Sequence, residues 1–106
     1  MKRFLAILVL SATLALPAVA DEPIKLVLRE HQWIPDRLEV PAGVKIQLIV
    51  KNDSDKIIEW ESADLDREEV IEPGKESTIF LGPLDKGSYG FYDDRHQDSK
   101  GVLVAK

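Results

Sequence analysis

The sequence contains no cysteine, and its only methionine is Met1. Disulfide bonds are therefore excluded, together with every metal site that needs a thiolate from the folded part of the chain. A small domain without disulfides depends on a packed hydrophobic core, or on a core together with a bound ion. Metal binding through oxygen and nitrogen ligands stays open.

Positive charge is scarce as well, because 14 Lys and Arg stand against 19 Asp and Glu and leave a formal charge of −5. Nucleic-acid binding needs clustered Lys and Arg that displace counterions from phosphates, so this class of partner is excluded. An acidic chain suits cationic ligands or a basic surface on a partner protein.

Three motifs that carry chemistry in other enzymes are missing. The sequence has no Gly-x-Ser-x-Gly turn for a nucleophilic serine, no His-Glu-x-x-His pair and no glycine-rich phosphate loop. Serine hydrolases, zinc proteases of that type and nucleotide-binding enzymes are therefore not supported.

The one long apolar run lies at the amino terminus. Lys2 and Arg3 precede an apolar stretch over residues 4–16, and residues 18–20 read Ala-Val-Ala, a small-residue cleavage pattern. The stretch is shorter than the roughly 20 residues that span a bilayer. We expect residues 1–20 to be a signal peptide and residues 21–106 to be a periplasmic domain that does not span the membrane after cleavage. Retention of residues 1–20 as an anchor is the alternative.

Loss of residues 1–20 would remove Lys2 and Arg3 and take the formal charge to −7. The rest of the chain has short β-favouring segments separated by Pro, Gly, Asp and Asn, which favours a β-sandwich or barrel. Only residues 62–69 have features of a helical turn. The expected strands are residues 24–28, 38–40, 44–50, 57–61, 77–81, 88–92 and 101–104, which makes seven or eight strands when short additions are allowed.

The end of the chain resembles a cupredoxin. Members of that family end in Tyr-x-Phe-x-Cys, a loop with His and Met, and a Gly before the last strand; Tyr89, Phe91, His96 and Gly101 match this pattern. Upstream, Trp33-Ile-Pro and a Leu-Glu-Val-Pro-Ala-Gly segment are similar to the family's opening motifs. The resemblance implies an all-β, cupredoxin-like Greek-key β-sandwich of seven to eight strands.

Two departures from the cupredoxin pattern affect the metal site. Asp93 stands where the family has its copper-binding cysteine, and Ser99 lies about where the axial methionine would be. A blue copper site needs a thiolate with a weak axial ligand. Such a site therefore cannot form in this chain.

Three further segments are similar to the cupredoxin-like modules of bacterial periplasmic iron-uptake systems, such as the amino-terminal domain of EfeO and the small FtrB-type proteins. These segments are Ile58-Glu-Trp-Glu-Ser62, Val70-Ile-Glu-Pro-Gly74 and Gly82-Pro-Leu-x-x-Gly-x-Tyr89. The resemblance implies a site for copper or ferric iron on the Glu-Trp-Glu strand. It also implies a partner such as an iron permease or another periplasmic uptake component.

The residues themselves indicate how such a site would be built. Glu59 and Glu61 are two apart on a strand and share a face, while Trp60 points to the core. If Asp93 and His96 reach the same end of the sandwich, three carboxylates and an imidazole converge, a donor set suited to ferric iron, copper(II) or manganese. His31 is a further candidate ligand. A solvated strand face for the glutamates, a turn for Asp93 and an exposed loop for His96 are the alternatives.

The sequence therefore predicts an exported metal-binding protein, with copper(II) or iron as the cation, that serves a membrane iron-uptake system. A small ferroxidase is one alternative, and it would need a redox-active metal with an open coordination position. A metal-free module that docks through its carboxylates on a basic partner is the other.

Overall fold

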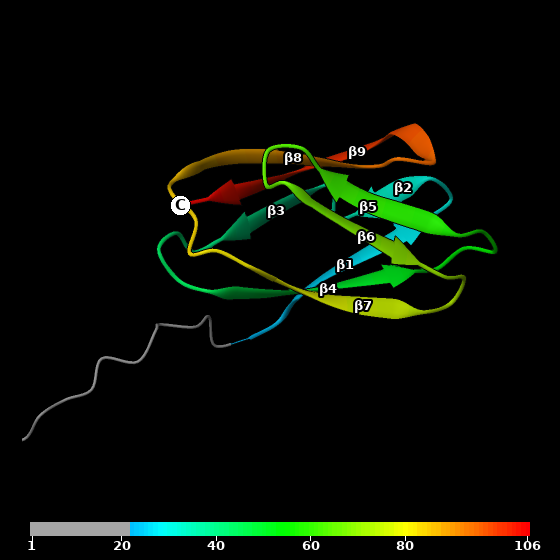
Figure 1. Cartoon of the computed structure of the whole chain (residues 1–106), viewed down its shortest axis with the longest axis horizontal. Coiled ribbons are helices and arrows are strands. Elements are labelled where there is room, and N and C mark those ends of the chain that lie inside the picture. The colour runs from blue at the N-terminus through cyan, green and yellow to red at the C-terminus, as the bar shows by residue number, and fades with distance from the viewer. Residues whose placement is uncertain (1–21) are drawn as a thin grey trace, which may run out of the picture.

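The computed structural model describes residues 22–106, and the expected signal peptide lies outside them. Two sheets pack face to face, with strand orders β2-β1-β4-β7 and β3-β9-β8-β5-β6 (Figure 1). The all-β sandwich expected from the sequence is confirmed. No helix in this part of the chain has the length and apolar character of a membrane span.

The strands are β1 Ile24–Arg29, β2 Gln32–Ile34, β3 Arg37–Val40, β4 Ile46–Asn52, β5 Ile58–Ser62, β6 Arg67–Ile71, β7 Glu76–Leu81, β8 Gly87–Asp93 and β9 His96–Ala105.

Residues 22–106 form nine strands, two more than the seven segments named from the sequence. The additional strands are β2, which has three residues, and β6, which occupies the end of the segment considered for a helical turn. Strand β6 pairs antiparallel with β5 and forms an edge of its sheet. Three of its five residues are exposed, so its sequence lacks a clear alternation of apolar and polar residues.

The core forms where the inner faces of the two sheets meet. Strand β4 buries alternate residues, as its sequence predicts, and β5 buries Trp60 completely. The Phe91 ring on β8 packs edge-on against Trp33 at a centroid distance of 5.5 Å and lies 6.0 Å from Trp60. The prediction that Trp60 belongs to the core is confirmed.

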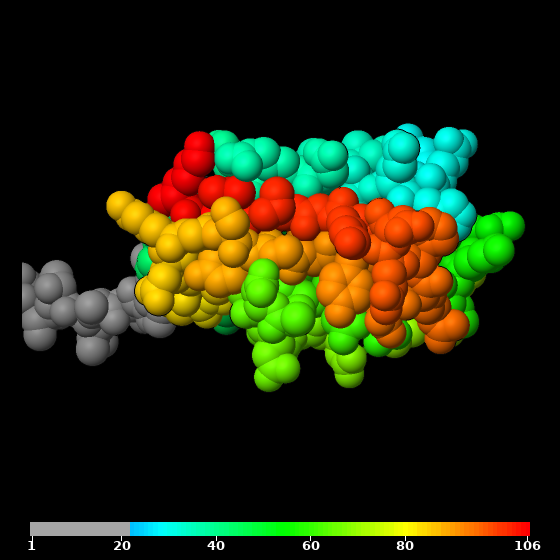
Figure 2. Space-filling view, turned by 90° about the horizontal axis from the view of Figure 1, so that it is seen from above, coloured from blue at the N-terminus to red at the C-terminus, as the bar shows by residue number. Residues whose placement is uncertain are grey.

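Figure 2 shows the face of the five-stranded sheet, where β8 and β9, in orange and red, lie between β3 and the hairpin of β5 and β6. The β1–β2, β4–β5 and β8–β9 connections gather at one end of the sandwich (Figure 1). We call this end the pole. Glu30 and His31 form the β1–β2 turn with left-handed φ angles of 50° and 62°.

Buried Asn52 organises the β4–β5 connection at the pole. Its amide donates to the backbone oxygens of Lys56 and Ile71 at 2.6 and 3.0 Å, and its oxygen accepts a hydrogen bond from the Ser54 hydroxyl. Asn52 therefore joins the β4–β5 connection to the last residue of β6. This contact fixes the start of β5, the strand that carries Glu59 and Glu61.

Candidate metal-binding site

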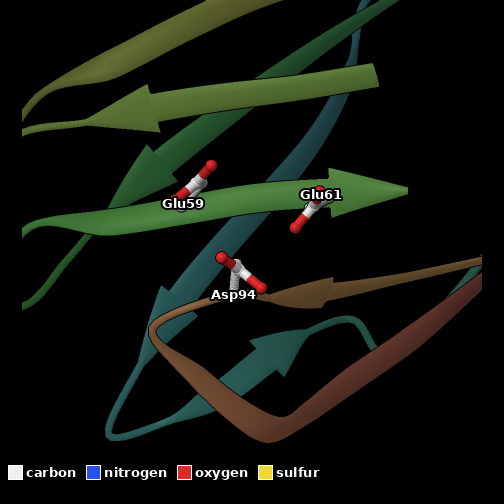
Figure 3. Close-up of side chains that lie close together, drawn as sticks. All are labelled: Glu59, Glu61 and Asp94. Atoms are coloured by element: carbon white, nitrogen blue, oxygen red, sulfur yellow. The ribbon is translucent and has the colours of Figure 1, made fainter. Parts of the chain in front are cut away.

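Glu59 and Glu61 project from β5 on the outer face of the five-stranded sheet. Their neighbours Ile58, Trp60 and Ser62 are buried, so the strand alternation leaves both glutamates half-buried on the opposite side. Asp94, directly after β8, points to the same place (Figure 3). One carboxylate oxygen of each residue lies within 4.8 Å of the other two. We call Glu59, Glu61 and Asp94 the acidic cluster.

The backbone holds the acidic cluster together. The N–H of Asp94 donates to the carbonyl of Glu59 at 2.9 Å, which ties the β8–β9 turn to β5. Strand β5 is also paired on both sides at Glu61, with Tyr92 on β8 and Glu68 on β6 as its register partners. Directly opposed residues in a sheet project on the same face. A tyrosine hydroxyl and a fourth carboxylate therefore flank the cluster.

The acidic cluster concentrates negative charge. Partial burial raises the pKa of Glu59 and Glu61, and the negative charge of Asp94 raises both further. For Glu59 the guanidinium of Arg95 opposes this rise, and for Glu61 a hydrogen bond with Tyr92 does so. Partial burial also raises the pKa of the Tyr92 hydroxyl, and Glu61 adds to the rise.

Ion pairs within residues 22–106 leave the acidic cluster uncompensated. They join Arg29 with Asp53, and Glu39 with both Arg37 and Lys106. The carboxylates of the acidic cluster therefore repel one another, and among the described residues only the nearby charge of Arg95 offsets part of this repulsion, at Glu59. A bound cation would relieve this repulsion.

Asp93 takes a different position from the one that the sequence suggested. Its side chain is buried, and its Oδ1 accepts hydrogen bonds from the backbone N–H groups of Glu59 and Arg95 at 2.9 and 3.1 Å. Asp93 thus links β5 to the β8–β9 turn, in agreement with the turn alternative. Among the described residues, the one group of three or more close ligand side chains contains Asp94 and neither Asp93 nor His96.

His31 and His96 come together at the pole and are not part of the acidic cluster. Their rings stack with centroids 4.0 Å apart and an interplanar angle of 16°. Both line a pocket of about 310 Å³, together with Asp93, Arg95 and the β4–β5 connection. The five residues predicted as ligands therefore fall into a glutamate pair on the outer face and a histidine pair with Asp93 at the pole.

Sequence reasoning missed Asp94, although one signal was available. Tyr92 and Asp94 are two apart at the end of a strand, the spacing that puts residues on one face. Asp93 was preferred because it aligns with the cysteine of cupredoxins. In the structure the aligned residue, Asp93, is buried in the sandwich, whereas Asp94 lies on the outer surface.

The acidic cluster fits a cation that prefers oxygen ligands. Carboxylates at this separation can share one ion, and the flanking phenol and Glu68 offer further oxygen donors. It does not fit a blue copper centre, because the chain has no cysteine.

Comparisons with known proteins agree with this architecture. The family model for the cupredoxin-like domain matches residues 3–105. An uncharacterized protein of Rickettsia prowazekii (strain Madrid E) is 39% identical over 82 residues, which are 76% of this chain. The chain spans 66% of the length of that relative.

Solved structures of cupredoxins share the fold at low sequence identity. Auracyanin from Roseiflexus castenholzii matches with a TM-score of 0.69 and 17% identity, over 82% of this chain and 98% of its own. Amicyanin from Paracoccus versutus matches with a TM-score of 0.65 and 10% identity, over 85% and 90% of the two chains. A purple cupredoxin from Nitrosopumilus maritimus matches with a TM-score of 0.61 and 15% identity, over 78% and 99%. Since the family model covers almost the whole sequence and the sandwich is shared, this chain belongs to the cupredoxin-like domain family.

Proposed function

We propose that this protein is an exported cupredoxin-like domain that binds ferric iron or copper(II) at the acidic cluster and serves a membrane iron-uptake system. The observation that carries the proposal is the approach of Glu59, Glu61 and Asp94 to within 4.8 Å of one another. Within residues 22–106 these three carboxylates have no ion-pair partner, and they lie close enough to repel one another. A bound cation would replace the repulsion among the three carboxylates with attraction to the ion.

The choice of ion rests on the donor atoms. The acidic cluster and its neighbours Glu68 and Tyr92 offer oxygen and no sulfur. Carboxylate oxygens suit hard cations, and this favours ferric iron over copper(I). The half-exposed position leaves room for water or a substrate in the remaining coordination positions. When bound, such an ion supplies a positive charge and, if it is redox-active, an electron acceptor.

The link to iron uptake rests on the likeness of the Glu-Trp-Glu strand to the cupredoxin-like modules of periplasmic iron-uptake systems. In this proposal Asp94 supplies the third carboxylate that the alignment had assigned to Asp93. The export step rests on residues 1–20, whose basic start, apolar stretch and Ala-Val-Ala end are typical of a signal peptide.

Calorimetric titration of the metal-free protein tests the metal proposal. We expect one tight equivalent of ferric iron, supplied as a soluble chelate, and weaker copper(II), with calcium and magnesium as controls for general attraction to acidic groups. The variant Glu59→Gln/Glu61→Gln should lose this binding. The matched control Glu72→Gln/Glu76→Gln removes the same charge from exposed positions elsewhere and should keep it. Equal loss of iron binding in both double variants would show that binding depends only on the net charge of the protein.

The acidic surface also supports the second candidate, a metal-free docking module for a basic partner. That candidate predicts no stoichiometric ion binding, and an affinity for the partner that falls steeply with salt. A ferroxidase would be recognised by oxygen consumption that depends on ferrous iron and turns over many times per protein molecule.

A further inference from the structure

The outer face of the four-stranded sheet carries an excess of positive charge, although the chain as a whole is acidic. Strands β1, β4 and β7 alternate between buried core residues and residues that point outward. One of these outward residues, Glu76 on β7, is acidic. The basic ones are Lys25, Arg29 and Lys51, and Lys45 joins them directly before β4. We call this surface, with its Lys and Arg side chains, the basic face.

The outer face of the five-stranded sheet has the opposite charge. Its basic residues are Arg37 and Lys100, and its acidic residues are Glu39, Glu59, Glu61, Glu68 and Asp94. Stacked sheets pack about 10 Å apart, and outward side chains on both sides widen the gap between the two faces. This separation exceeds the Debye length of about 8 Å at physiological ionic strength. Salt therefore screens the basic face from the charge of the acidic cluster.

Apolar side chains stand among the cations of the basic face. Phe80 is 49% exposed and Ile34 is 45% exposed. The Nζ atom of Lys45 lies 4.8 Å from the centre of the Phe80 ring, and Lys25 is the register partner of half-buried Ile49. A lysine side chain covers apolar groups with its methylene stem and keeps its ammonium in water. The basic face is thus amphipathic, as are the helices that lie on membrane surfaces.

The lysines of the basic face can bind anions. Ion pairs within residues 22–106 engage Arg29, through Asp53, and do not involve Lys25, Lys45 or Lys51. All three lysines are exposed. Attraction to an anionic lipid surface adds up over nearby lysines, and three of them raise the affinity about 100-fold. The basic face therefore carries enough charge to recognise such a surface.

We propose that the basic face docks on an anionic lipid bilayer, for which phosphatidylglycerol is the probe lipid. The lysines contact the headgroup phosphates, and Phe80 and Ile34 rest among the headgroups. Because the basic residues are spread over neighbouring strands of one sheet, a plane of headgroups meets all of them at once. The acidic cluster then faces away from the bilayer and stays accessible to ions. This inference needs no metal ion, so it goes beyond the proposed function and does not depend on it.

Sedimentation with lipid vesicles tests the proposal, on the protein in the form that cells export. We expect binding to phosphatidylcholine vesicles that contain phosphatidylglycerol, at least tenfold tighter than to phosphatidylcholine alone. This binding should weaken as the salt concentration rises, because salt screens charges at a surface. Lys25→Gln/Lys45→Gln/Lys51→Gln should weaken it about 100-fold.

The matched control Lys56→Gln/Lys86→Gln/Lys100→Gln removes the same charge from exposed positions elsewhere and should keep vesicle binding. The proposal is overturned by no binding to the anionic vesicles, by equal binding to both kinds of vesicle, or by equal loss in the two triple variants. Glu59→Gln/Glu61→Gln should keep vesicle binding, so failure of the acidic cluster is told apart from failure of the basic face.

Phe80→Ser tests the apolar contact with the headgroups. Loss of the exposed ring should weaken binding to the anionic vesicles at least threefold, since less apolar surface is buried in the headgroup layer. Val70→Ser is the matched control, because Val70 is 55% exposed and lies on the face of the acidic cluster, opposite Glu59 on β5. Equal effects of the two variants would contradict docking through the basic face. Circular dichroism checks that both variants are folded, and the lysine variants decide the proposal if one is not.

Discussion

Asp93 and Asp94 are consecutive in the chain, yet their carboxylates serve opposite sides of the five-stranded sheet. The Asp93 carboxylate accepts the N–H of Glu59 from within, while the Asp94 side chain joins the Glu59 and Glu61 side chains outside. One residue therefore holds the β8–β9 turn in place, and the next presents a ligand from it.

The first prediction separates these two roles. Asp94→Asn should weaken ferric iron binding and leave the unfolding free energy nearly unchanged, because the Asp94 side chain is exposed. Asp93→Ala should instead lower the unfolding free energy by about 1–3 kcal/mol, since the partly buried N–H of Glu59 loses its acceptor. Urea unfolding and calorimetric titration of both variants provide the measurements. The reverse assignment of effects would show that Asp93 is the ligand.

The second prediction concerns alternate residues of β5. Trp60→Ala should lower the unfolding free energy by roughly 3–5 kcal/mol, because the indole is fully buried against the core. Glu59→Gln should leave the fold intact and weaken metal binding. Chemical denaturation monitored by far-ultraviolet circular dichroism distinguishes the two. A larger loss of stability in the glutamate variant would mean that the assignment of faces is wrong.

The third prediction follows from the raised pKa values of Glu59 and Glu61. A carboxyl whose pKa is higher in the folded state than its ordinary value of 4.5 binds its proton more tightly when folded. Ionisation of these groups therefore costs stability as the pH rises through and above 4.5. Glu59→Gln/Glu61→Gln should raise the melting temperature at pH 7 in the absence of metal, and the gain should shrink at pH 4.

Thermal melts of the metal-free protein and this variant at several pH values provide the measurement. The control Glu72→Gln/Glu76→Gln should show a smaller gain at pH 7. A gain that is larger at pH 4 than at pH 7 would contradict the pKa directions.

The fourth prediction concerns colour. Any copper(II) complex of this protein should be pale, because the intense absorption of blue copper arises from a thiolate ligand and the chain has no cysteine. Visible absorption spectroscopy of the copper-loaded protein gives a direct answer. A strong blue band from the pure protein would show that the site chemistry described here is incomplete.

Local patterns in the sequence were sufficient for much of the fold. The alternation along residues 46–50 and the spacing of Glu59 and Glu61 each depend on strand geometry alone, and the structure agrees with both. Strand β6 was not predicted because an edge strand with most residues exposed needs no alternation. Its pairing depends on the neighbouring β5 rather than on its own residues.

The site was harder to predict than the fold because it depends on register and on distant contacts. The register of β8 with β9 shifts between Tyr92 and Asp93, and the position of such a shift cannot be read from the sequence. The stacking of His31 on His96 joins turns that are far apart in the chain. No local pattern carries that information.

The position of β9 has a consequence for the order in which the strands pair. This last strand pairs antiparallel with β8 and parallel with β3, so its residues complete the middle of the five-stranded sheet. Within residues 22–106 β3 pairs only with β9, so β3 has no partner in its sheet until β9 is in place. Pairing of strands so distant in sequence is also slow. The five-stranded sheet therefore closes only when β9 joins it, and a chain without β9 would leave an edge of both β3 and β8 unpaired.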